Sequence, residues 1–228
     1  MSTLQLTDPR LSSLVLFAGK HSNRENGMCI MEATAWLAGE PHTDHPICAC
    51  PVIAAFLRGL NDHVRDSNRQ KLVALIPLLV TSKSSTSVEI KRAYHLLDFT
   101  IRSAVPIVLD QVLPDWAAKF RALEKLSDKT TIRRSRELVS SLADFFPSAL
   151  ALALDLALAL DLALDLDRAR ALDLARALDL ARALDLALAL ALDVARALDL
   201  ALDLARALET TITEKAIVAV SEALAIKE

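Results

Sequence analysis

The sequence predicts an all-α fold, in which a helical N-terminal domain precedes a long helical region rich in alanine and leucine. Hydrophobic residues make up 53% of the 228 residues, whereas aromatic residues make up only 4%. Glycine occurs 4 times, although an average protein contains about 7% glycine. The many turns of a β-sandwich or barrel, and the glycine-rich loops of a nucleotide-binding α/β fold, are therefore not expected.

About seven helices are expected in the N-terminal domain, most of them marked by a capping residue or a proline and by apolar residues at helical spacing. The expected starts are Asp8-Pro9, residue 28, Pro51, Ser67, the residues after the serine-rich linker 82–87, and Asp128 or Thr130, while Pro106 and Pro114 punctuate the stretch before the last of these. We expect Gly19 and Gly39 to end the first two helices. Pro77 lies inside the fourth helical pattern, where we expect it to kink the helix.

The region Ala149–Leu208 follows a strict alternation over 60 residues. Every odd position is Ala or Asp, and every even position is Leu or Arg except for Val194. Ala and Asp codons can differ only at the middle base, and so can Leu and Arg codons. We therefore interpret this repeat block as an expanded hexanucleotide repeat, whose regularity reflects the DNA rather than a binding code.

The alternation itself is typical of a β-strand, yet 60 residues without a turn far exceed an ordinary strand. Ala and Leu have high helix propensities. Each of the six arginines also has an aspartate three residues before it, which is ion-pair spacing in a helix. We therefore expect the repeat block to be helical. A C-terminal β-solenoid is the alternative, because six-residue repeats build such coils, and a disordered block is the third reading.

The expected organisation is a helical domain over residues 1–148, the repeat block over 149–208, and an amphipathic helix over 209–228. Thr211 and Glu214 match a capping box at the start of this last helix. In a helical block, the two-residue period places leucine on every side, and such a helix must be buried. We therefore expect the block to pack on the rest of the chain or on copies of itself, and we predict a homo-oligomer.

Charge, cysteine content and the N-terminus exclude several classes of protein. The net charge is −3, and no basic face is evident, so nucleic-acid binding is not expected. Three cysteines in a chain of this length do not indicate a disulfide framework, and reduced thiols in the cytoplasm are the simple interpretation. The N-terminus lacks the pattern of a signal peptide. Aspartates interrupt the longest apolar run, so we expect no membrane span.

One cluster of residues suggests a metal site, because thiolates and imidazoles at short spacing can bind zinc. The candidate zinc ligands are Cys29, His42, His45, Cys48 and Cys50. Glu32 belongs to the same constellation, three residues after Cys29. The spacing does not match a standard zinc knuckle, however. In the alternative interpretation, Cys29 and Cys50 are small residues of the hydrophobic core.

Catalytic motifs are less evident than the metal cluster. The sequence contains no phosphate-binding loop, no GxSxG and no EF-hand pattern. Cys48 and His45 could form a thiol and base pair, but no third member or oxyanion-stabilising group can be named. We therefore name no catalytic residue, and we expect a role other than that of an enzyme.

Residues 27–62 carry a resemblance to a known group of proteins. The similar segments are Met31-Glu32-Ala33, Gly39-Glu40-Pro41, Asp44-His45-Pro46, Pro51-Val52, Phe56-Leu57-Arg58 and Asn61-Asp62. In these segments the chain resembles an uncharacterised actinobacterial and actinophage protein family without an established activity. The resemblance implies a bacterial or phage origin and an intracellular protein. It covers about the first 125 residues and leaves the repeat block outside.

Two functional hypotheses follow from the sequence. The first is a structural or protein-interaction protein that self-associates through the repeat block. The alternative is a small zinc-binding protein, either an enzyme or a regulator, whose site lies around residues 29–50.

Overall fold

The computed structural model describes residues 8–111, 113–145 and 202–227. Within these ranges every regular element is helical and no strand is present, so the described part of the chain confirms the all-α prediction. No helix in these ranges is long and apolar enough to cross a membrane. The expectations for residues 149–201, whether helix, solenoid or disorder, lie outside the described residues.

The chain from residue 8 to residue 79 forms two regular helices and several short ones. In order they are α1 (Pro9–Ser12), the 3₁₀ turn η1 (Arg24–Asn26), α2 (Ile30–Ala38), α3 (Pro51–His63), α4 (Asp66–Arg69), the 3₁₀ helix η2 (Gln70–Leu75) and α5 (Ile76–Leu79). As predicted, α2 ends at Gly39, which adopts a left-handed conformation with φ 78°, and α3 begins at Pro51.

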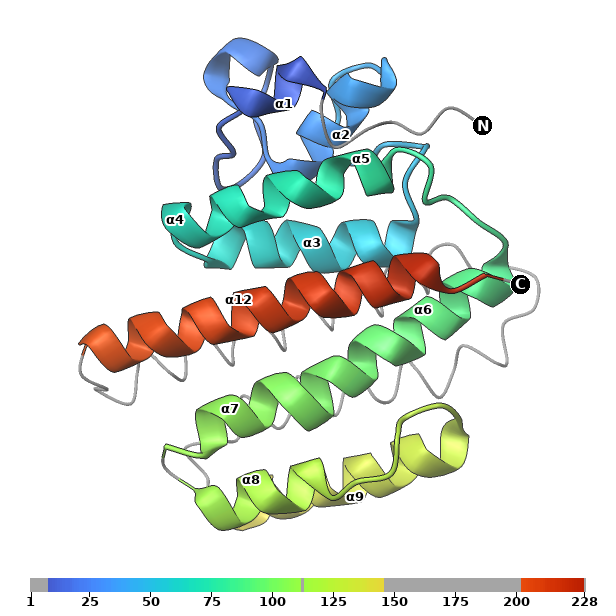
Figure 1. Ribbon diagram of the computed structural model, residues 1–228. Coiled ribbons are helices and arrows are strands. Elements are labelled where there is room, and N and C mark those ends of the chain that lie inside the picture. Colours follow the sequence, from blue (N-terminus) through green and yellow to red (C-terminus); the bar gives the residue numbers. More distant parts are fainter. Residues whose placement is uncertain (1–7, 112, 146–201, 228) are drawn as a thin grey trace.

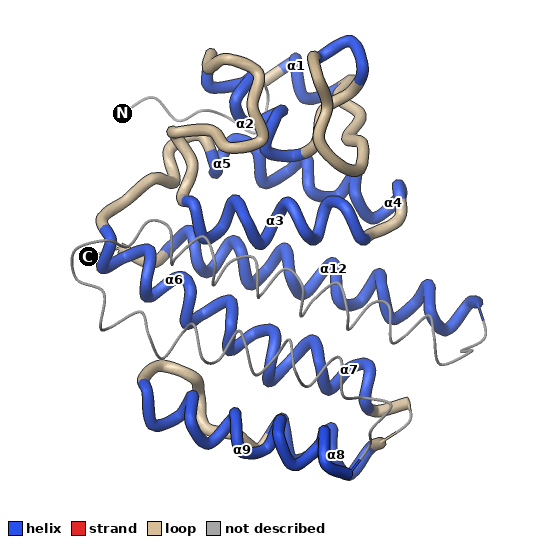
Figure 2. The backbone as a smooth tube through the Cα atoms, turned by 180° about the vertical axis from the view of Figure 1, so that it is seen from behind, coloured by secondary structure: helices blue, strands red, loops and turns tan. Residues whose placement is uncertain are grey.

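The remaining described helices follow in the second part of the chain. They are α6 (Thr86–Phe99), the π-helical turn η3 (Thr100–Ala104), α7 (Val105–Leu109), α8 (Pro114–Arg121), α9 (Lys129–Phe145) and α12 (Leu202–Ala225). In Figure 1, α1 and α2 lie at one end of the stack and α8 and α9 lie at the other. Helices α3, α12 and the continuous α6–α7 rod fill the middle (Figure 2).

The first helix is much shorter than predicted, because it ends at Ser12 rather than at Gly19. Contacts with distant parts of the chain replace the local helical ones. The Leu16 N–H donates to Gln70 Oε1, and the Gln70 Nε2 donates back to the Leu16 carbonyl, both at 2.9 Å. The Gly19 N–H donates to Asp62 Oδ1 at 2.7 Å. Residues 13–19 therefore form a non-helical segment that is hydrogen-bonded to η2 and α3.

Two prolines, Pro77 and Pro106, are preceded by turns of a different helix type, and the chain continues as a helix through both. Pro77 lies in the first turn of α5, where its missing N–H costs nothing. The expected kink takes the form of the 3₁₀ helix η2 that precedes it. Pro106 likewise lies in the first turn of α7. The turn before it widens into the π-helical η3, in which the Val105 N–H donates to the Thr100 carbonyl.

The last helix, α12, begins earlier than the sequence indicates. It starts at Leu202, so the final seven residues of the repeat block are helical. The predicted capping box is wrong, because Thr211 lies inside the helix and its hydroxyl donates to the Ala207 carbonyl at 2.9 Å. A helix start is not needed at Thr211, since the Ala- and Leu-rich residues before it continue the same helix.

Helix α12 is part of the same hydrophobic core as the N-terminal helices. It contacts α3, α4, η2, α6 and α7, and it lies between α3 and α6 in Figure 1. Its buried hydrophobic residues are mostly three or four positions apart: Leu208, Ile212, Ala216, Ala219, Val220 and Ala223. Packing therefore joins the helix at the end of the repeat block to helices that lie far before it in the sequence.

A buried arginine fastens the C-terminal end of α12. Arg92 of α6 is 5% exposed, and its Nε donates to the Ala223 carbonyl at 3.0 Å. Its Nη2 donates to the Ile226 carbonyl at 3.3 Å, and its Nη1 donates to the Ser82 carbonyl. The last carbonyls of a helix have no partner within the helix. Arg92 therefore satisfies them and places its positive charge at the negative end of the helix dipole.

A buried glutamate fastens α12 near its other end. Glu209 is 3% exposed, and its Oε1 accepts the Arg65 N–H at 2.7 Å and the Asn68 Nδ2 at 3.0 Å. Its Oε2 lies 3.3 Å from Arg65 Nε. Arg65 is the N-cap residue of α4, so the carboxylate of Glu209 caps the start of that short helix.

Replacement of the buried arginine tests this arrangement. We expect Arg92→Ala to lower the free energy of unfolding by about 2–4 kcal/mol, because buried carbonyls lose charge-assisted hydrogen bonds. Lys91→Ala, which changes an exposed neighbour on the same helix, should stay within about 0.5 kcal/mol of the wild type. Urea denaturation followed by circular dichroism measures both. Equal stability of the two variants would contradict the proposed role of Arg92.

Candidate functional site

The five predicted zinc ligands lie at the start of α2 and in the loop that leads from α2 to α3. Cys29 and Cys50 are buried N-cap residues, of α2 and α3 respectively, which confirms the interpretation of these two as core residues. Within the described residues, no group of three or more His, Cys, Asp or Glu side chains is arranged to hold a metal ion. The zinc site therefore stays a prediction from the sequence.

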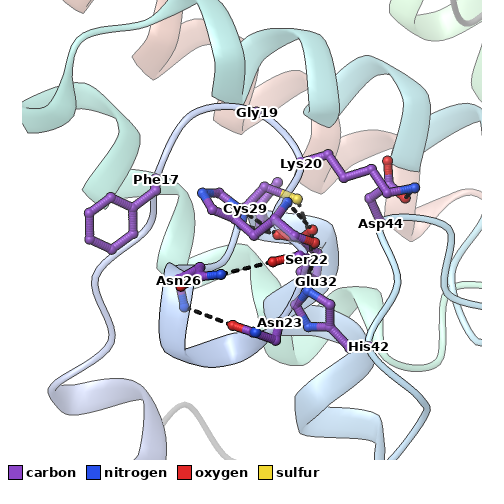
Figure 3. Close-up of polar contacts among 12 residues, drawn as sticks. Phe17, Gly19, Lys20, Ser22, Asn23, Asn26, Cys29, Glu32, His42 and Asp44 are labelled. Atoms are coloured by element: carbon purple, nitrogen blue, oxygen red, sulfur yellow. Dashed lines mark hydrogen bonds and ion pairs between the residues drawn. The ribbon is translucent and has the colours of Figure 1, made fainter.

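The centre of this region is the carboxylate of Glu32, which is fully buried. Its Oε1 accepts the His21 N–H at 2.7 Å. Its Oε2 accepts the Cys29 N–H at 2.8 Å and also lies 2.8 Å from His21 Nδ1. His42 Nε2 lies 3.5 Å from Oε1, so three segments of the chain meet at one side chain (Figure 3).

The spacing Cys29-x-x-Glu32 has a local structural cause. The Cys29 Sγ accepts the Glu32 N–H at 3.5 Å, while the Glu32 carboxylate accepts the Cys29 N–H. This is the reciprocal pattern of a capping box, with a thiol in the place where serine or threonine is usual. The Cys29-x-x-Glu32 spacing, which suggests metal ligands in the sequence, thus reflects the N-terminal cap of helix α2.

His21 is a central residue that the sequence did not indicate. It lies 11 residues before Glu32, outside any helix, and no spacing rule connects two such positions. The nearby Gly27 has φ +116°, and a Cβ atom there would come within 3.0 Å of the His21 and Phe17 rings. In the sequence, the one feature that relates to His21 is Gly27 in a polar loop. A glycine by itself does not indicate that His21 contacts Glu32.

Two further carboxylates hold the loop between α2 and α3. Glu40 accepts the backbone N–H groups of Ile47 and Cys48, both at 2.8 Å. Asp44 Oδ1 lies 2.9 Å from His45 Nδ1 and 3.2 Å from Lys20 Nζ. The predicted ligands His45 and Cys48 are thus bound to separate carboxylates of the same loop.

Hydrogen bonds keep these carboxylates ionised. Burial opposes ionisation of Glu32, but bonds from the Cys29 N–H, the His21 N–H and the His21 ring outweigh it and lower the pKa of Glu32. The pKa of Glu40 and the pKa of Asp44 are lowered against burial in the same way. All three side chains therefore act as hydrogen-bond acceptors at neutral pH.

The thiols, in contrast, are kept protonated. Burial raises the pKa of Cys29 to about 12. Burial and the nearby Glu40 carboxylate raise the pKa of Cys48 to about 12, and burial also raises the pKa of Cys50. Because the thiolate is the form that attacks electrophiles, these surroundings disfavour a cysteine nucleophile.

The chemistry available at this site is therefore limited. A buried carboxylate that holds Nδ1 of a histidine can orient that histidine as a base, and the pair of Glu32 and His21 has this arrangement. Its thiol neighbour, Cys29, is protonated and caps a helix, so it is not an activated nucleophile. The geometry favours a structural role in which Glu32 joins the His21 loop, the start of α2 and the His42 loop.

Comparison of the chain with protein-family models, with curated proteins and with solved structures gave no match in any of the three. The resemblance of residues 27–62 to an actinobacterial and actinophage family therefore stays a prediction. The polar residues that carry it are the same residues that hold the loops in place, namely Glu32, Glu40, Asp44 and Asn61. Asn61 Nδ2 donates to the Phe17 carbonyl at 2.9 Å, and Asn61 Oδ1 accepts the Ile30 N–H.

Thiol labelling tests the environment of the cysteines. We expect the native protein at pH 7.5 to react with a disulfide reagent such as DTNB more slowly than free cysteine does, because the three thiols are protonated and at least partly buried. All three should react rapidly in guanidinium chloride. A labelling phase of the native protein that is faster than that of free cysteine, and that disappears in Cys48→Ser, would reveal an activated Cys48 thiol. That result would contradict this account.

The pH dependence of stability tests Glu32. Because its pKa is lower in the folded protein than the ordinary value of 4.5, Glu32 stabilises the fold above that pH, and the stabilisation is lost as the pH falls through the lowered pKa. At pH 7 we expect Glu32→Gln to be less stable by about 1–3 kcal/mol. Its stability should also fall less steeply below pH 4.5 than that of the wild type.

The matched control is Glu25→Gln, which changes an exposed carboxylate of the η1 turn. This variant should keep the stability and the acid slope of the wild type. An unchanged acid slope in Glu32→Gln would show that the buried carboxylate contributes nothing to the folded state.

Proposed function

We propose that this chain is a structural or protein-interaction protein that self-associates through the repeat block Ala149–Leu208. The observation that carries the proposal is that α12 runs through the last seven residues of the block and enters the core as a helix. The block is therefore joined to the helical domain at its C-terminal end through a helix of the core, which favours a role in assembly.

The described end of the block supports helical geometry over the alternation of a strand. Arg206 and Leu208 occupy successive even positions, which would face the same way in a strand. In α12, Arg206 is exposed and Leu208 is buried. In the helix, two even-numbered side chains of the block therefore differ in exposure, although a strand would place them on the same face.

The leucine content then provides the driving force for association. The block has 23 leucines at its 30 even positions, and a helix with this pattern is apolar on all sides. Helix α12 already occupies the surface of α3 and α6, so these two helices offer little further apolar area. A second copy of the block supplies the complementary surface, since association buries apolar area from water.

The candidate site supports the same kind of function. Its carboxylates are occupied by backbone N–H groups, and its thiols are protonated. Because no three of the predicted ligands converge within the described residues, we do not propose a metal-dependent activity for residues 29–50.

Light scattering on the full chain tests the proposal. We expect a concentration-dependent average mass that exceeds the 24.8 kDa of one chain by twofold or more. A variant with four leucines replaced by glutamine, at Leu158, Leu160, Leu188 and Leu190, should need about tenfold higher concentration to reach the same mass, because it buries less apolar area.

The control variant places glutamine at the neighbouring alanines Ala157, Ala159, Ala187 and Ala189. It adds the same polar groups but removes far less apolar surface, so its association should stay within about twofold of the wild type. A folded wild-type chain that remains a monomer across the whole concentration range would refute the proposed function.

A further inference from the structure

The polar loop that precedes α2 contains the one asparagine of the chain that is followed by glycine. The sequence has four asparagines, and only Asn26 has glycine as its next residue. Asn26 is exposed and ends the η1 turn. Because glycine has no Cβ, no side chain on residue 27 shields its backbone nitrogen from the side-chain amide of Asn26. Asn26 and Gly27 therefore bring an amide carbon and an amide nitrogen to the spacing that closes a five-membered ring.

The side chain of Asn26 is hydrogen-bonded within its own exposed turn (Figure 3). Its Nδ2 donates to Ser22 Oγ at 2.8 Å. The Gly27 N–H donates to the Arg24 carbonyl at 3.2 Å, which is the long end of the usual range for such a bond. Ser22, Arg24 and Asn26 are all exposed. A turn of this kind opens at little cost in free energy, and its opening frees the Gly27 nitrogen.

We propose that Asn26 is a deamidation site, which the chain converts to aspartate and isoaspartate without an enzyme. The Gly27 nitrogen attacks Asn26 Cγ and the Cγ–Nδ2 bond breaks, so that Nδ2 leaves as ammonia with the proton that the Gly27 nitrogen gives up. Water then opens the succinimide ring that has formed. Cleavage of the bond from the Gly27 nitrogen to Cγ gives aspartate, and cleavage of its bond to the backbone carbonyl carbon gives isoaspartate. Nothing is oxidised or reduced, and water is the sole co-reactant.

Isoaspartate changes the backbone of a loop that is closed at both ends. The Phe17 N–H donates to the Met28 carbonyl at 2.9 Å, so residues 17–28 form a closed loop. Isoaspartate inserts one extra methylene into the backbone of this loop, immediately before Gly27. A Cβ atom on Gly27 would already come within 3.0 Å of the rings of His21 and Phe17. Because so little space remains on that side, the longer backbone displaces Gly27 from its place against the rings.

The displacement reaches the buried carboxylate of Glu32 through the His21 ring. Gly27 faces the edge of that ring that carries Cδ2 and Nε2, whereas Glu32 Oε2 lies 2.8 Å from Nδ1 on the other side of the ring. The His21 N–H also donates to Glu32 Oε1 at 2.7 Å. Isoaspartate therefore loosens the contact between His21 and Glu32. Aspartate adds a charge at Asn26 but leaves the backbone length unchanged, so it keeps that contact.

Peptide mapping by mass spectrometry tests the deamidation, with the full-length protein incubated in mildly alkaline buffer. Asn23 is the internal control, because it is exposed at the start of the same turn but is followed by Arg24. We expect Asn26 to gain one mass unit, from the replacement of NH₂ by OH, about tenfold faster than Asn23. The reaction should be slower in mildly acidic buffer, because the attacking nitrogen has to lose its proton, and Asn26→Ser should gain no mass at this position. Conversion of Asn26 that is absent, or no faster than that of Asn23, would overturn the inference.

Hydrogen exchange of the incubated protein tests the coupling to Glu32. The control is Asn26→Asp, which carries the new charge without the extra methylene. The backbone N–H groups of His21 and Cys29 both donate to Glu32. In the isoaspartyl form, identified by electron-transfer fragmentation, we expect these two groups to exchange about tenfold faster than in the fresh protein, and in Asn26→Asp at the wild-type rate. Wild-type exchange in the isoaspartyl form, or equally fast exchange in Asn26→Asp, would show that the inserted methylene does not act on the Glu32 contacts.

Discussion

The fold depends on the return of the chain, after the repeat block, to the helices that precede it. Helix α12 fills the space between α3 and α6, and it is held at one end by Arg92 and near the other by Glu209. Both side chains are buried and charged, so each would be costly without its partners. The carbonyls of α12 and the N-cap of α4 supply those partners. Along the sequence, the repeat block therefore lies between two segments that share one core.

A second constraint organises the region where the sequence suggests chemistry. The buried carboxylate of Glu32 needs several donors, and His21 and Cys29 provide them. The same demand explains why the loops around α2 are so closely held, since Glu40 and Asp44 bind backbone and side-chain donors in the same manner. Glu32 and Glu40 thus serve as hydrogen-bond acceptors that tie the loops to the ends of α2.

Helix boundaries that depend on neighbouring residues could be predicted from the sequence. Features that depend on contacts between distant residues could not. Gly39 and Pro51 mark helix ends correctly, because capping depends on neighbouring residues. The first helix ends early because Gln70 binds the backbone of Leu16 across 54 residues. His21 was missed for the same reason, since its partner is not a sequence neighbour. The Cys29-x-x-Glu32 spacing was recognised but interpreted as metal ligation, because a thiol rarely caps a helix.

The most direct test of the central claim is hydrogen exchange of the native full-length protein, followed by mass spectrometry. If α12 is an integral part of the core, peptides from α12 should exchange with the same opening free energy as peptides from α3 and α6, because all three are then exposed in one cooperative unfolding event. Rapid exchange of α12, while α3 and α6 stay protected, would show that the C-terminal helix folds apart from the N-terminal helices and would contradict the account.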